Sequence, residues 1–268
     1  MTMMLTPDLL DRRALVLLQL VDGRGQPVEG PVAVTGPGVR SVAKRGGQIA
    51  LLEATGLATY GASFATPVAP AVASVTLAVD LTPAAGDVLP RRLTLRLPRD
   101  PDPANRALLA SLFQPVVVPF AASPRIKANG NDCILRVAVR RTTDQAMVEN
   151  ALVRARSADG THSAWGLTDA SGEAALVFGA LPITFAGGGG ATLPTIDCAV
   201  VVHADPASAR FATPQTLAAA RRDAATRSTR HANPDAIATA QPTDFAGAAM
   251  VAIGAGRQPT ISLGWTPP

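Results

Sequence analysis

One of the three histidines, His162, lies among residues that suggest a catalytic triad. Ser163 follows it directly and Asp159 precedes it by three positions, so a nucleophile, a base and an acid are present. A triad requires three groups that converge on a pocket. Here all three lie around the pair Asp159-Gly160, which is typical of a turn between two strands of a hairpin. We interpret the cluster as a turn and expect no catalytic residues.

Three aspartates could supply oxygen ligands to a calcium ion at the tips of loops. They are Asp144, Asp159 and Asp169. A calcium site needs several oxygens in a defined order along a loop, and no such order is present. Aspartate is also a common turn residue, because its carboxylate accepts hydrogen bonds from nearby backbone amides. We therefore interpret the three as turn residues and expect no metal site.

Glycines and cysteines give two further candidates for chemistry. The run Gly187 to Gly190 could hold a phosphate, but no Lys-Ser/Thr pair follows it, so we interpret it as a loop. The two cysteines, Cys133 and Cys198, lack the spacing of a metal site. Both begin apolar strands, and whether they form a disulfide or remain reduced thiols stays open at this stage. We expect no cofactor.

The chain is basic, with 24 lysines and arginines against 20 acidic residues. Five arginines make the C-terminal part locally basic: Arg210, Arg221, Arg222, Arg227 and Arg230. Binding to nucleic acid normally also uses aromatic side chains on which bases stack, and these are scarce in the chain. Docking onto an acidic protein neighbour is the alternative, and we expect nucleic acid not to be a partner.

Strand patterns dominate the sequence. Aromatic residues make up 4% of the chain, so valine, leucine and alanine must build the core. Apolar residues alternate with polar ones in many short segments, for example at Leu135, Val137 and Val139 between Arg136 and Arg140. Turn pairs such as Asn129-Gly130 separate these segments. The pattern predicts an all-β protein of antiparallel sandwiches.

The order of the segments predicts four regions. Residues 1–98 form a first β-sandwich unit, and residues 99–131 a mainly extended connector with a short helix over 104–113. Residues 132–205 form a second β-sandwich unit. Residues 206–268 form a C-terminal arm with a helix from about 213 to 227 and strands over 248–255 and 260–265. These two strands either complete the second sandwich or pair with a neighbouring protein, and both alternatives stay open.

The second unit resembles the carboxypeptidase-regulatory-like, transthyretin-like domains. The matching stretches are Val148-Glu-Asn-Ala-Leu-Val153, Thr168-Asp169-Ala-Ser-Gly172-Glu-Ala and Phe178-Gly-Ala-Leu-Pro182. Pro182-Ile-Thr-Phe185 stands where those domains usually have Pro-x-Tyr. In the first unit Lys44-Arg-Gly-Gly47 replaces the T-D-x-x-G turn, so the match there is weaker. The resemblance implies two Ig-like or transthyretin-like β-sandwiches and no catalysis.

The general architecture is similar to accessory proteins of phage tails and contractile injection particles, although no motif carries this second resemblance. We expect a non-enzymatic structural protein of a large assembly, with protein neighbours bound through the 206–268 arm. The alternative is a module that binds glycans or cell surfaces through exposed aromatic residues, for which Trp165, Tyr60, Trp265 and a few phenylalanines are the candidates.

The first residues, Met1-Thr-Met-Met-Leu5, lack the basic segment and the long apolar core of a signal peptide. We expect cytoplasmic synthesis, followed by incorporation into a particle that is assembled in the cell or released from it. No stretch approaches the ~20 apolar residues of a membrane helix, so we expect no membrane span.

Overall fold

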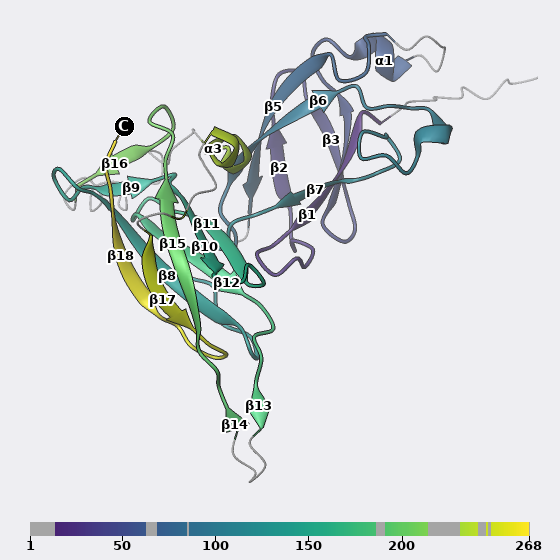
Figure 1. Ribbon diagram of the computed structural model, residues 1–268. Helices are drawn as coiled ribbons and strands as arrows, with labels where there is room; N and C mark the ends of the chain where they lie inside the picture. Colours follow the sequence, from purple (N-terminus) through teal and green to yellow (C-terminus); the bar gives the residue numbers. More distant parts are fainter. Residues whose placement is uncertain are drawn as a thin grey trace, which may run out of the picture. The chain divides into compact units, whose positions relative to one another are not determined.

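The computed structural model describes residues 14–62, 69–84, 86–185, 191–213, 231–240, 245 and 248–267. Strands dominate these residues, which confirms the all-β class (Figure 1). The chain divides into two compact units. The first comprises residues 1–19, 34–79 and 94–118, and the second comprises residues 20–33, 80–93 and 119–268.

The N-terminal strands form two sheets. The first has the order β3-β4-β1-β7, with β3 at Arg40–Lys44, β4 at Gln48–Glu53, β1 at Val16–Val21 and β7 at Val116–Pro119. The second has the order β2-β5-β6, with β2 at Val32–Thr35, β5 at Val75–Pro83 and β6 at Arg91–Leu97. A short helix, α1 (Ala58–Ala62), and a 3-10 turn, η1 (Pro103–Asn105), lie in the connections.

The core of the first unit follows the alternation in its strands. Val16 and Leu18 of β1, Leu51 of β4, Leu77 of β5 and Leu95 of β6 are buried. In β1, β5 and β6 these residues have partly or fully exposed neighbours, as a period of two requires, whereas Leu51 follows the buried Ala50 in β4. The predicted alternation is confirmed in β1, β5 and β6.

The second unit is built from two larger sheets. The first has the order β11-β10-β15-β17, with β11 at Ser163–Leu167, β10 at Leu152–Ser157, β15 at Ile196–His203 and β17 at Ala249–Ile253. The second contains β12 (Glu173–Phe178), β8 (Cys133–Arg141), β9 (Met147–Glu149), β16 (Arg210–Ala212) and β18 (Thr260–Trp265). A hairpin of β13 (Thr184–Phe185) and β14 (Ala191–Thr192) extends from this unit, which also carries helix α3 (Pro234–Ala240) (Figure 1).

One apolar core contains side chains from both of these sheets. Leu135 and Val137 of β8 lie in it with Val153 of β10 and Val200 of β15. The hairpin turn at Asp159-Gly160 and the turn at Asp169 to Gly172 are present, and both glycines have the positive φ that such turns require. The predicted inward faces and turns of this region are therefore confirmed.

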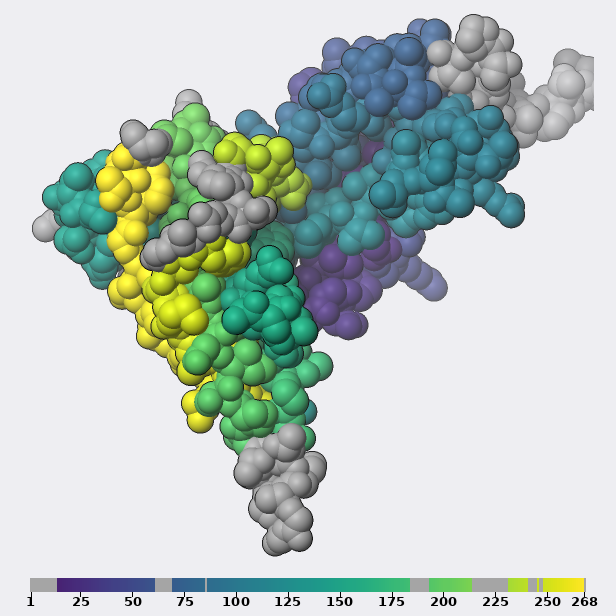
Figure 2. Space-filling view, viewed as in Figure 1, coloured from purple at the N-terminus to yellow at the C-terminus, as the bar shows by residue number. Residues whose placement is uncertain are grey.

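The C-terminal strands complete the sheets of their own chain. β17 pairs antiparallel with β15, and β18 pairs parallel with β8. Figure 2 shows these yellow residues lying along the green strands of the same unit. Val251, Ile253 and Trp265 enter the core, and this burial favours pairing within the chain. Of the two alternatives for residues 206–268, a separate arm is therefore wrong for these strands. The parallel pair also departs from the all-antiparallel prediction.

The unit boundaries also differ from the predicted ones at 98, 131 and 205. Residues 20–33 belong to the second unit, and one reason is the ion pair between Arg24 Nε and Asp132 Oδ2, at 2.7 Å. Arg24 also donates to the carbonyl of Lys127, at 2.7 Å. The predicted connector is divided between the units at residues 118 and 119. Its predicted helix over 104–113 is reduced to η1, whereas its extended segment is present as β7.

Burial of a charge tests the assignment of the core. Val137→Asp or Val200→Asp places a carboxylate among apolar side chains that leave the native residue at most 1% exposed. We expect a loss of about 4 kcal/mol or more in the free energy of unfolding. Thermal unfolding followed by circular dichroism measures it. Met250→Asp is the matched control, because Met250 is 63% exposed in the same unit, and it should leave the transition unchanged. An unchanged melting temperature for both core variants would contradict the assignment.

Candidate functional site

The predicted turn accounts for the triad-like cluster. The carboxylate of Asp159 accepts hydrogen bonds from the hydroxyls of Ser157 and Thr161, and these bonds lower its pKa to about 2. His162 enters this network through its backbone amide, which donates to Ser157 Oγ at 3.0 Å. The carboxylate therefore stabilises the turn and does not orient the imidazole, as the acid of a triad would.

Asp144 and Asp169 each serve their own turn. The hydrogen bond from Arg141 and that from the Ala146 amide lower the pKa of Asp144 to about 2. Asp169 accepts from the amides of Ser171 and Glu173, at 2.8 and 3.2 Å, and burial raises its pKa. Across the described ranges, no three His, Cys, Asp or Glu side chains gather in a way that could hold a metal ion.

Cys133 and Cys198 are both buried in the core of the second unit as free thiols. Burial raises the pKa of both, that of Cys198 to about 11, so both are neutral near pH 7. Arg210 lies in β16 opposite Glu149 of β9. The other arginines singled out in the sequence (Arg221, Arg222, Arg227 and Arg230), the run Gly187 to Gly190 and the predicted helix over 213–227 fall outside the described residues, apart from residue 213.

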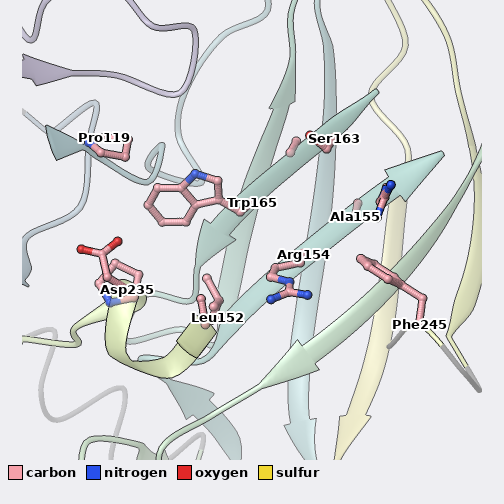
Figure 3. A pocket seen from close by; sticks show the side chains of 12 residues that line it. Pro119, Leu152, Arg154, Ala155, Ser163, Trp165, Asp235 and Phe245 are labelled. Atoms are coloured by element: carbon pink, nitrogen blue, oxygen red, sulfur yellow. The ribbon is translucent and has the colours of Figure 1, made fainter. Parts of the chain in front are cut away.

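A cavity of about 340 Å³ lies on the outer face of β10 and β11 (Figure 3). Its apolar lining includes Leu152, Trp165 and Phe245, and α3 contributes Pro234 and Ala238. Of the three aromatic residues singled out in the sequence, only Trp165 lines this cavity. Tyr60 is buried and donates to the carbonyl of Arg99, and Trp265 is buried and stacked on Phe211.

The pairing of β10 with β11 determines which side chains lie next to each other in the cavity. Val153 and Ala155 point into the core, so the alternate residues Leu152 and Arg154 point outward. Arg154 lies directly opposite Trp165 in the pairing of β10 with β11. The alternation in each strand could be read from the sequence, but the pairing that places these two side chains next to each other could not.

A buried arginine fixes α3 beside the cavity. Arg91 has no exposed side-chain surface, and its guanidinium pairs with Asp235 in the first turn of α3 and donates to the carbonyl of Pro119. Burial lowers the pKa of Arg91, and the charge of Asp235 opposes that shift. In addition, the amide of Arg92 donates to the carbonyl of Ala232, at 2.7 Å. Asp235 therefore helps to hold α3 against β6 through its ion pair with Arg91.

Helix α3 is not among the elements that the sequence pattern predicts for residues 206–268. The signal for it was present. Asn233 accepts a hydrogen bond from the amide of Ala236 through its side chain, Pro234 starts the helix, and Asp235 lies in its first turn. This order of asparagine, proline and acid is a common start of a helix.

A second candidate surface belongs to the first unit and consists of residues 99–117, which are the connection before β7 and the first two residues of that strand; it is called the apolar loop below. Four large apolar side chains of this loop are exposed: Leu108 by 55%, Leu109 by 89%, Phe113 by 55% and Val117 by 61%. In the sequence they were assigned to a helix and an extended segment, and neither pattern indicated that they face solvent.

Hydrogen bonds centred on Asp100 hold the apolar loop in shape. Its carboxylate accepts from the Asp102 amide at 2.9 Å and from the Asn105 side chain at 2.7 Å. Its backbone bonds to Ala110 and Leu112, at 3.0 and 2.7 Å. The loop therefore presents its apolar side chains from a backbone that is already ordered.

The structure thus defines an all-β protein with two candidate binding surfaces. No protein-family model matches the chain, and no curated protein matches it in sequence. Among solved structures, the Bacillus anthracis TIE protein is 11% identical over 94% of this chain, with a TM-score of 0.26. The shaft pilin spaA from Lactobacillus rhamnosus GG is also 11% identical, over 74% of this chain and 92% of the pilin, with a TM-score of 0.20.

The chain spans 33% of the length of the TIE chain. TM-scores this low carry no argument about fold or function. Among the helices that the structure describes, none has the length and apolar character to cross a membrane.

His203 provides a test of the packing beside the cavity. It lies opposite Leu152 in the pairing of β15 with β10. Within the described part of the chain, its buried Nε2 atom has no hydrogen-bond partner. Burial, and then the charge of Arg154, lower its pKa, so the folded state favours the neutral imidazole. In the unfolded chain histidine takes up a proton near pH 6.5.

The free energy of unfolding should therefore fall as the pH drops below about 6.5, because the unfolded state then binds more protons. His203→Leu removes the proton uptake by His203 on unfolding. The free energy of unfolding of this variant should therefore fall less steeply between pH 6.5 and 5 than that of the native protein. Urea unfolding at a series of pH values measures the difference. The pKa of His231 is also lowered, so the free energy of unfolding of the variant should still depend on pH to some extent. Equal slopes for the two proteins would contradict the prediction.

Proposed function

We propose that the chain is a non-enzymatic interaction protein that joins a larger protein assembly through the apolar loop. The observation that carries this proposal is the exposure of Leu108, Leu109, Phe113 and Val117 on a loop fixed by hydrogen bonds. Exposed apolar surface is unfavourable in water, and burying it contributes about 25 cal/mol per Å². A loop that is already ordered also avoids much of the entropy cost of binding.

The kind of assembly is a finer part of this proposal. We propose an accessory component of a phage-tail-like contractile injection particle, with the second unit as a carboxypeptidase-regulatory-like domain. The order of hairpins around Asp159-Gly160 and around Asp169 to Gly172 supports the domain assignment. The kind of assembly is supported by the similarity in general architecture to accessory proteins of phage tails and contractile injection particles. In this proposal the contacts come from the apolar loop and not from β17 and β18, because these strands pair within the chain.

Charge placed on the apolar loop should release the protein from its assembly. The double variant Leu109→Asp, Phe113→Asp adds two carboxylates where both native side chains are more than half exposed. The melting temperature should stay within about 2 °C of the native value, because surface substitutions cost little. In a native lysate, sedimentation of the chain should shift from a large complex to the free protein.

Val42→Asp is the matched control for this experiment. Val42 is 45% exposed in β3 of the same unit but lies outside the apolar loop. This variant should still sediment with the complex. Two results would overturn the proposal: a native chain that sediments alone in the lysate, or a double variant that stays in the complex.

A further inference from the structure

The cavity on the outer face of β10 and β11 has a chemical character of its own. Its lining is mainly apolar, with Trp165 on one side of Arg154 and Phe245 on the other (Figure 3). The guanidinium carbon of Arg154 lies 5.7 Å from the centre of the Phe245 ring. Arg154 is half-buried, and partial burial of a cation strengthens its attraction to an anion.

The lining contains two other charged side chains, Asp235 and Arg156. Asp235 pairs with the buried Arg91, so its charge is compensated within the protein. Arg156 lies over the β10–β11 turn, where a Cβ atom on Gly160 would come within 2.6 Å of its Nη2 atom. Arg154 has no ion pair among the residues that the structure describes. With the charge of Asp235 compensated, the lining presents the positive charges of Arg154 and Arg156.

The polar side chains of the cavity suit an anion better than a ligand that carries many hydroxyl groups. A guanidinium has only donors, so it complements an acceptor such as a carboxylate. A sugar needs both donors and acceptors around its ring. Besides Asp235, the lining offers one side-chain acceptor, the hydroxyl of Ser163. The flat apolar surfaces of Trp165 and Phe245 complement a planar ring.

We propose that this cavity binds a small organic anion with a planar apolar body, an aryl carboxylate, whose carboxylate pairs with Arg154 while its ring lies against Trp165 and Phe245. The volume of about 340 Å³ falls within the range of small-molecule sites. This proposal concerns the second unit and is independent of the apolar loop. Failure of one proposal therefore leaves the other standing.

Calorimetric titration of the full chain with matched probes tests the proposal. The probe 2-naphthoate carries the anion, and 2-naphthamide keeps the ring without the charge. We expect saturable binding of one naphthoate per chain, with the amide at least about tenfold weaker, which is about 1.4 kcal/mol. Raising the salt concentration should weaken binding of the naphthoate and not that of the amide.

Two substitutions locate the bound probe. Arg154→Met keeps the aliphatic bulk of the side chain and should weaken naphthoate at least about tenfold, to the level of the amide. Arg154→Lys keeps the charge and should retain part of the affinity. Trp165→Ala should weaken naphthoate and naphthamide together, because both lose the contact with the ring. Melting temperatures show whether each variant is folded, and Arg154→Lys keeps the test valid if Arg154→Met is not.

Arg140→Met is the control, because Arg140 lies on β8 of the other sheet, outside the lining of the cavity. It should bind naphthoate like the native chain. Three results would overturn the proposal: equal affinities for the naphthoate and the amide, native affinity in Arg154→Met, or loss of binding in Arg140→Met. Preferential binding of methyl glucoside would also overturn it and would favour a glycan site.

Discussion

The second unit depends on the backbone pairing of β8. The first three residues of this strand are buried on both faces, since Leu135 enters one apolar cluster and Ile134 enters another. Water therefore has little access to its amides and carbonyls, which need partners in the protein. β12 pairs with one edge of the strand. β18, which lies more than a hundred positions further along the chain, pairs with the other edge. Both faces at the start of β8 can be buried because the backbone there is paired on both edges, with β12 and, through the amide of Ile134, with the carbonyl of Arg257.

The buried charge of Arg91 imposes a similar demand at α3. A guanidinium without exposed surface is costly unless it is paired and hydrogen-bonded. Asp235 and the carbonyl of Pro119 meet that need, so the position of the helix is fixed by chemistry and not by apolar contact alone. Ile237 adds the apolar part by packing on Leu152 and Leu167. One wall of the cavity therefore depends on this ion pair together with the packing of Ile237.

Alternation in the sequence predicted which side of each strand faces the core, because successive side chains of a strand point to opposite faces. Leu135, Val137 and Val200 are examples. It did not predict which strands are neighbours, since the pattern carries no information about the partner. The parallel pairing of β18 with β8 and the contact of Arg24 with Asp132 join distant residues, and nothing local marks them.

The candidate sites were less predictable than the core. Trp165 was recognised as an exposed-type aromatic residue, but its pairing with Arg154 depends on the register of two strands. The pattern of residues 104–113 in the apolar loop predicts a short helix, and that pattern does not indicate that Leu108, Leu109 and Phe113 face solvent. The exposure of this loop results from the hydrogen bonds of Asp100, whose side chain shapes the backbone of the loop. The hydrogen bonds of Asp100 join residues that are close in the sequence. Whether the neighbouring apolar side chains then face solvent depends on the rest of the fold.

The pairing of β8 with β18 has a consequence for biosynthesis. A ribosome makes residues 133–141 long before residues 260–265, at roughly 5–20 residues per second. During that interval one edge of β8 has no partner from its own chain. An unpaired edge of an apolar strand is a template for pairing with other chains. The nascent second unit is therefore a natural client for chaperones until its last strand emerges, whereas residues 94–118 of the first unit have already left the ribosome.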